Sequence, residues 1–223
     1  MDPFRLCLAL GPVAIYLLLL GAINLSRRPF LVTGGRDGAA LGLAASGFVL
    51  VGPVELFFPD FMAIRLGVLT PFAGPIICVF LLGCYILGMS IVLLLLRPRL
   101  VVYNISVDQL RAVLADLVEK LDRDARWAGD SLAMPELGVQ LHIEYLPTMR
   151  NVSLVSTGPQ QSHLGWRRLE IALAAALGEV AVPRNPRGRS LLASGMLIGA
   201  MLVAAVALNP QAVAQSLIEM LRL

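Results

Sequence analysis

Four apolar runs, each close to the length that crosses a bilayer, constrain this chain more than any other feature of its sequence. A transmembrane helix needs about 20 predominantly apolar residues in succession. The runs are roughly Leu6–Leu25, Ala39–Phe58, Phe72–Leu96 and Ser190–Leu208. Hydrophobic residues make up 57% of the chain, more than a soluble globular domain carries. The sequence therefore predicts an α-helical membrane protein with four transmembrane helices. The lipid bilayer is accordingly one of its expected partners.

The polar stretch Arg97–Arg189 between the third and fourth runs has the size of a small domain with its own core. Its clearest strand is 139–145, where apolar residues alternate with Gln140, His142 and Glu144. Its clearest helix follows the capping box Ser106–Gln109 and runs to about Asp122, with apolar residues spaced 3.6 apart. Further strands are expected at 100–105, 126–132 and 152–156, and a second helix at 162–178.

The resulting element order is β-α-β-β-β-α. It predicts an inserted α+β domain in which two helices cover one face of an antiparallel sheet and the other face is open to water. After the last apolar run, Asn209–Leu223 carries a minority of polar residues on one side. This tail is expected to form an amphipathic helix that lies on the membrane surface or docks on a partner.

Arginine placement predicts how the chain crosses the membrane, because basic residues concentrate in cytoplasmic loops. One side of the proposed arrangement holds Arg27, Arg28 and Arg36, and the two domain junctions, which fall on the same side, hold Arg97, Arg99, Arg184, Arg187 and Arg189. The opposite side holds only Arg5, Arg65 and Arg222. We therefore expect a multi-pass protein with a cytoplasmic domain at 97–189 and both termini outside. The near-complete use of arginine over lysine (Lys120 is the single lysine) is typical of high-GC bacteria and indicates a bacterial inner membrane.

Charge and cysteine placement exclude several classes of function. Apart from its junction arginines the domain is slightly acidic, which makes nucleic acid an unfavourable partner. The element order is similar to that of double-stranded-RNA-binding domains, but 162–166 lacks their phosphate-binding lysine cluster. All three cysteines, Cys7, Cys78 and Cys84, lie in apolar runs, so no cysteine-based zinc site or disulfide framework is expected in the domain. No cofactor or metal is predicted.

Few residues stand out as candidate sites. His142 and Glu144 share one face of a strand, where they could act as acid and base, although polar residues are expected on an open sheet face. Glu55 is the one carboxylate within an apolar run, near an end where it can reach water. Small residues four apart allow close helix packing. These candidate helix-packing positions are Gly38, Gly42, Gly195 and Gly199.

These features favour a non-catalytic protein, because they include packing motifs and a compact domain without a recognisable catalytic motif. The leading hypothesis is a scaffold, accessory or regulatory subunit that binds another membrane protein or a second copy through its domain. A second hypothesis is a membrane enzyme that acts on a lipid or lipid-linked substrate at the cytoplasmic surface. A third is a sensor of a small molecule.

Overall fold

The computed structural model describes residues 2–52, 73–147, 149–159 and 161–221. The chain separates into two compact units. The first consists of Met1–Leu19, Ala39–Leu94 and Leu191–Leu223, and the second of Leu20–Gly38 and Leu95–Ser190. The second unit therefore combines the polar insert with the segment that follows the first apolar run. Of the sequence-based candidates, Glu55 lies outside the described residues.

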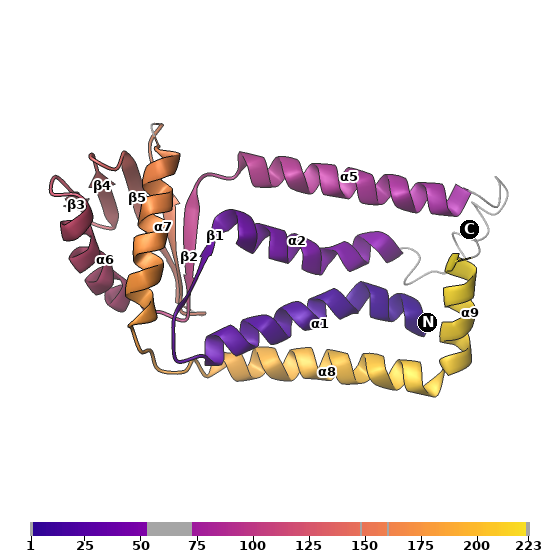
Figure 1. The fold of residues 1–223 in the computed structure, drawn as a ribbon. Helices are drawn as coiled ribbons and strands as arrows, with labels where there is room; N and C mark the ends of the chain where they lie inside the picture. Colours follow the sequence, from indigo (N-terminus) through magenta and orange to yellow (C-terminus); the bar gives the residue numbers. More distant parts are fainter. Residues whose placement is uncertain (1, 53–72, 148, 160, 222–223) are drawn as a thin grey trace. The chain divides into compact units, whose positions relative to one another are not determined.

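The first unit is helical. Its helices are α1 (Pro3–Leu25), α2 (Gly34–Val51), α5 (Ala73–Leu95), α8 (Arg187–Leu208) and α9 (Pro210–Leu221), although one end each of α1, α2, α5 and α8 belongs to the second unit (Figure 1). Within the described ranges, α1 and α8 are long and apolar enough to cross a membrane. Only 17% of the apolar stretch of α1 and 11% of that of α8 are buried inside the protein. Their apolar side chains are therefore left largely unburied by the protein, which is compatible with membrane association.

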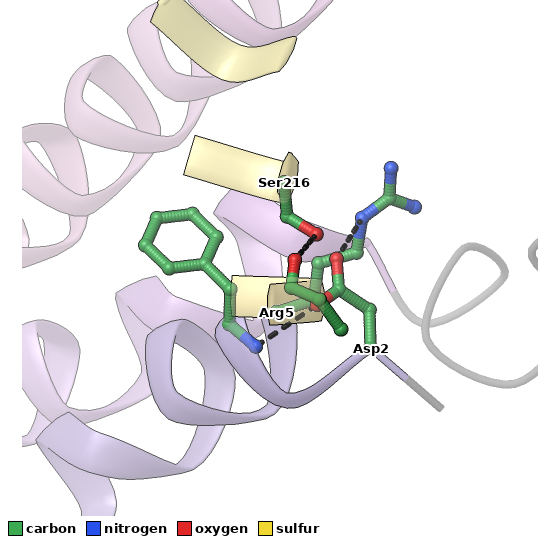
Figure 2. A network of polar contacts seen from close by, with 5 residues as sticks. Asp2, Arg5 and Ser216 are labelled. Atoms are coloured by element: carbon green, nitrogen blue, oxygen red, sulfur yellow. Dashed lines mark hydrogen bonds and ion pairs between the residues drawn. The ribbon is translucent and has the colours of Figure 1, made fainter. Parts of the chain in front are cut away.

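Side-chain hydrogen bonds and an ion pair lie at the start of α1 and within α9. At the start of α1, the Asp2 carboxylate accepts a hydrogen bond from the Phe4 amide (3.0 Å) and pairs with Arg5 (3.3 Å), as Figure 2 shows. In α9, the Ser216 hydroxyl donates to the Ala212 carbonyl (2.9 Å). The carboxylate of Asp2 thus satisfies an amide that the first turn of a helix leaves without a partner.

The second unit is built on one antiparallel sheet, as the sequence predicts. Its strands follow the order β1-β2-β6-β5-β4-β3, and every pairing between neighbours is antiparallel. Two helices, α6 (Val107–Leu121) and α7 (His163–Gly178), pack against this sheet. The strands are β1 (Phe30–Thr33), β2 (Arg99–Tyr103), β3 (Arg126–Ala128), β4 (Ser131–Met134), β5 (Val139–Leu146) and β6 (Asn151–Ser156).

The sheet has six strands where the sequence analysis expected four, for two physical reasons. The single strand expected at 126–132 is interrupted at Gly129, whose φ of +62° is a conformation that glycine adopts without strain. The chain turns there and forms the β3–β4 hairpin, with Ala128 opposite Ser131. The other new strand is β1, which lies between α1 and α2 and pairs along β2, with Leu31 opposite Val102.

The core of the second unit lies between one sheet face and the two helices (Figure 1). Helix α6 contributes Leu110, Leu114 and Val118. The capping box predicted for this helix is present, because the Ser106 hydroxyl accepts from the Gln109 amide and the Gln109 side chain accepts from the Ser106 amide. The sheet contributes alternate residues of its strands, namely Leu100, Val102, Leu132, Met134, Val139, Leu141, Ile143, Val152 and Leu154.

The other face of the sheet is not uniformly open, which corrects the one-sided arrangement expected from the sequence. On β5, Gln140 and Glu144 are exposed, as predicted. On β2, however, Val101 and Tyr103 are buried. The Tyr103 hydroxyl donates to the Asp37 carboxylate, which also pairs with Arg99 at 3.4 Å. Because Asp37 belongs to the first turn of α2, that turn is bonded to β2 on the face expected to be open.

Three buried asparagines connect the end of α1 to the rest of the second unit. Asn24, Asn104 and Asn185 are at most 2% exposed. The Asn104 amide group donates to the Ser26 carbonyl (2.7 Å), and that of Asn185 donates to Asn24 Oδ1 (3.0 Å) and to the Met149 carbonyl (3.1 Å). Buried polar groups are stable only when they are hydrogen-bonded. These asparagines therefore fix the chain where it enters and leaves the polar insert.

Candidate functional site: the outer face of helix α7

Helix α7 is positioned by a cap and by a close backbone approach. The Ser162 hydroxyl accepts from the Gly165 amide (3.1 Å), which caps the first turn. Gly165 is needed because a Cβ there would lie 2.0 Å from the Leu137 carbonyl oxygen. The Trp166 indole donates to Gln161 Oε1 (2.8 Å) and packs into the core. The buried side of α7 then continues through Leu169, Leu173 and Leu177.

The opposite side of α7 is also apolar, and it is exposed. Leu164 is 74% exposed and Ile171 is 63% exposed. Residues seven apart lie on the same side of a helix, so these two side chains share one stripe, diametrically opposite Leu173. We call this stripe the α7 outer face, and it consists of Leu164, Arg168, Ile171, Ala175 and Gly178, all exposed.

Helix α6 shows what an ordinary water-facing helix looks like in the same unit. Its exposed residues include Asp108, Asp116, Glu119 and Lys120, as expected of an amphipathic helix that covers a core. The α7 outer face carries a single charged residue, Arg168, between its two large apolar side chains. Exposed apolar side chains grouped on one face mark interaction sites, whereas single ones are common on any surface.

The sequence analysis predicted a helix at 162–178 and did not single out its outer side. The apolar residues Trp166, Leu169, Leu173 and Leu177 account for the core-facing positions and leave Leu164 and Ile171 unexplained. Their seven-residue spacing was the available signal. It was hard to use, because many interior positions of a helix covering a sheet are also apolar.

The two strand residues singled out in the sequence lie on the sheet face away from α6 and α7. His142 Nδ1 lies 3.0 Å from the Ser131 hydroxyl on the neighbouring strand β4. Glu144 lies opposite Ser153 and is exposed. Within the described part of the chain, no hydrogen bond or ion pair joins His142 to Glu144, and no group of three or more His, Cys, Asp or Glu residues could hold a metal ion.

The candidate helix-packing glycines fall into different environments. A Cβ at Gly42 would meet the Met89 side chain at 2.6 Å, and the Tyr85 hydroxyl donates to the Gly42 carbonyl (2.6 Å). A Cβ at Gly195 would meet Leu18 at 2.9 Å, whereas one at Gly199 would meet nothing within 4 Å. Gly38 lies near the start of α2 and is partly buried.

A further close contact, at Gly47, was not predicted from the sequence. A Cβ there would lie 2.3 Å from the Leu8 carbonyl oxygen. Within the first unit, Gly42, Gly47 and Gly195 therefore lie at contacts of α2 with α5, of α2 with α1, and of α8 with α1. Such close approach of helix backbones is the packing that small residues permit.

A hollow of about 460 Å³ lies beside the end of α6 and is lined by Ala115, Val118, Glu119, Asp122, Arg123, Ala125 and Trp127. Its buried carboxylate, Asp122, accepts from the backbone amides of Glu136 (2.9 Å) and Asp124 (3.0 Å). These bonds fold the chain around the 135–138 turn. They also satisfy the oxygens of this buried carboxylate.

Comparisons of the chain with models of known protein families, with curated proteins and with solved structures find no match. Its function is therefore argued from its own geometry, in which the α7 outer face groups two large exposed apolar side chains, Leu164 and Ile171.

Proposed function

We propose that this chain is an integral membrane protein that serves as a scaffold or accessory subunit, and that its α+β unit binds another protein through the α7 outer face. The exposure of Leu164 and Ile171 on one stripe carries this proposal. Burying a leucine or isoleucine side chain in an interface contributes roughly 1.5–3 kcal/mol. The two side chains together therefore supply a substantial part of a specific binding energy.

The charges around the stripe indicate the chemistry of the partner. Arg168 lies between Leu164 and Ile171, and Arg167 is exposed beside it. A complementary surface would combine apolar side chains with carboxylates, which pair with guanidinium groups at an interface rim. Another membrane protein with such a surface is the partner that we favour over a second copy.

A double substitution tests the docking proposal. Leu164→Glu with Ile171→Glu is expected to weaken partner binding at least ~100-fold, because two apolar contacts are lost and two carboxylates must be desolvated. Particle mass, measured by light scattering after mild detergent solubilisation from native membranes, is expected to fall to that of the single chain. Ala112→Glu with Ala115→Glu, on the exposed side of α6, is the matched control and should keep the larger mass. A wild-type particle that is already a lone chain would refute the proposal.

We further propose that α2 and α5 cross the membrane together with α1 and α8, with the second unit in the cytoplasm and both termini outside. The contacts of Gly42 and Gly47 with neighbouring helices support a helical bundle, and the arginine distribution supports the orientation. The bundle would belong to the inner membrane of a bacterium, which the arginine usage favours.

Reporter fusions test this orientation. A reporter enzyme that is active only in the cytoplasm is expected to be active when it is fused after Gly129. A reporter enzyme that is active only outside the cytoplasm is expected to be active when it is fused after Leu223. Gly129 is an exposed turn residue, so an insertion there should be tolerated. The opposite pair of signals would reverse the arrangement. Two cytoplasmic signals would mean that the chain crosses the membrane an even number of times, or not at all, between Gly129 and Leu223.

A further inference from the structure

The junction between α1 and α8 brings together two basic segments that are far apart in the sequence. The Val182 amide donates to the Arg27 carbonyl (2.9 Å), and the Asn185 amide donates to the Asn24 carbonyl (3.0 Å). Gly188 lies so close to the end of α1 that a Cβ would meet the Gly21 carbonyl oxygen at 3.0 Å. Figure 1 shows the end of α1 beside the start of α8. The backbones of the two arginine-bearing segments are therefore joined at this junction.

Side-chain hydrogen bonds hold this backbone framework in place. Asn24 and Asn185 are buried and bonded to each other, and Arg150 Nη1 donates to the Pro183 carbonyl (2.9 Å). The framework leaves the surrounding guanidinium groups exposed. We call four of these residues the junction arginines: Arg27, Arg28, Arg184 and Arg189.

The junction arginines differ from two arginines of the same unit that are paired with carboxylates. Arg99 pairs with Asp37, and Arg111 pairs with Asp130. Among the residues that the structure describes, none of the junction arginines forms an ion pair. Like charges held together without counter-charges repel one another, and this repulsion favours binding of an anion.

The start of α8 strengthens the case for an anion. Its first turn contains no acidic residue and begins with the sequence Arg187-Gly188-Arg189. A helix N-terminus carries partial positive charge, so cations there are unfavourable unless an anion neutralises them. An anion at this junction would interact with the helix end and with the guanidinium groups together.

We infer that the junction arginines bind the phosphate of an anionic phospholipid headgroup. Guanidinium groups match phosphate oxygens in geometry and charge. The two helices that meet at the junction, α1 and α8, are the ones long and apolar enough to cross a membrane, so acyl chains of the same lipid could lie along them. Basic sites beside transmembrane helices bind anionic lipid headgroups in this way. The inference rests on the proposed membrane insertion.

The experiment uses the delipidated full chain in mild detergent and measures bound lipid by native mass spectrometry. Phosphatidylglycerol is expected to bind, and phosphatidylcholine, which has no net charge, is expected to bind at least ~10-fold more weakly. Arg27→Gln with Arg28→Gln should weaken phosphatidylglycerol binding about 30-fold, since each basic residue near the membrane surface contributes roughly a fivefold factor. Arg184→Gln with Arg189→Gln, on the other segment, should have a similar effect.

Control variants distinguish loss of a specific binding site from a general loss of positive charge and from misfolding. Arg123→Gln with Arg126→Gln removes the same charge from exposed positions elsewhere in the unit and should leave lipid binding unchanged. Tryptophan fluorescence should show the wild-type unfolding transition in every variant, and Arg27→Lys with Arg28→Lys should restore part of the binding. Equal binding of the two lipids, equal loss in the control, or displacement by millimolar inorganic phosphate would each overturn the inference.

Membrane insertion is measured separately by extraction of native membranes with alkaline carbonate. A chain that stays in the membrane but binds both lipids equally would overturn the lipid site and leave the proposed function intact. A chain that carbonate releases would overturn both.

Discussion

Replacing Leu141 by aspartate is expected to unfold the second unit, whereas aspartate at the adjacent Gln140 is expected to be tolerated. Leu141 is fully buried (0% exposed) on β5, opposite Leu132 of β4 and in the core that α6 and α7 cover. Loss of the leucine side chain alone lowers the free energy of unfolding by about 3 kcal/mol. A buried carboxylate without a partner lowers it by several kcal/mol more. That sum is comparable with the whole free energy of unfolding of a small domain.

Gln140 offers a matched control because it points to the opposite face. Its side chain is exposed, and its backbone amide and carbonyl, which bond to Gln161, are kept in the variant. Both tryptophans of the chain, Trp127 and Trp166, lie in the second unit, so tryptophan fluorescence during thermal unfolding of the full chain reports on this unit. Equal sensitivity at the two positions would mean that the outer face of β5 is covered by lipid or by a partner.

Replacing Asn185 by leucine is expected to lower the unfolding temperature of the second unit by about 15 °C. The leucine has a similar volume but makes none of the side-chain hydrogen bonds. Three groups would lose their partner, namely Asn24 Oδ1, the Met149 carbonyl and the Arg187 amide. Each unsatisfied buried group costs about 1 kcal/mol or more, and 1 kcal/mol corresponds to roughly 4–8 °C in a domain of this size.

Two further substitutions test the mechanism of this effect. Asn209→Leu removes an exposed asparagine side chain that donates to the Ala205 carbonyl at 3.5 Å, and it should leave the transition unchanged. Asn185→Asp keeps the acceptor for the Arg187 amide but places a carboxylate against the oxygens of Asn24 and Met149, so it should destabilise at least as much as leucine. A wild-type transition in Asn185→Leu would show that the buried asparagines do not hold the junction together.

The sequence by itself determined the elements whose signals are local. The capping box at Ser106 and Gln109 and the helical spacing after it predict α6, because hydrogen bonds and side-chain positions within one helix depend on residues three or four apart. The alternation from Val139 onward predicts β5 and the burial of Leu141, because a strand that covers a core has a period of two. The antiparallel sheet follows from several such strands joined by short connections.

Tertiary structure alone decided the features that depend on residues far apart. Strand β1 is four residues long and is stabilised by pairing with β2, a segment that begins more than sixty residues later, so nothing local distinguishes it from a loop. The burial of Asn24 and Asn185, the role of Asp37 beside Tyr103 and the hydrogen bond from the Val182 amide to the Arg27 carbonyl arise in the same way. Each requires a partner that the folded backbone brings near, and such long-range contacts have no periodicity along the chain. That is why the sequence predicts the helices and strands that have a local pattern, while β1 and the surfaces that we propose for docking and lipid binding appear only once the chain has folded.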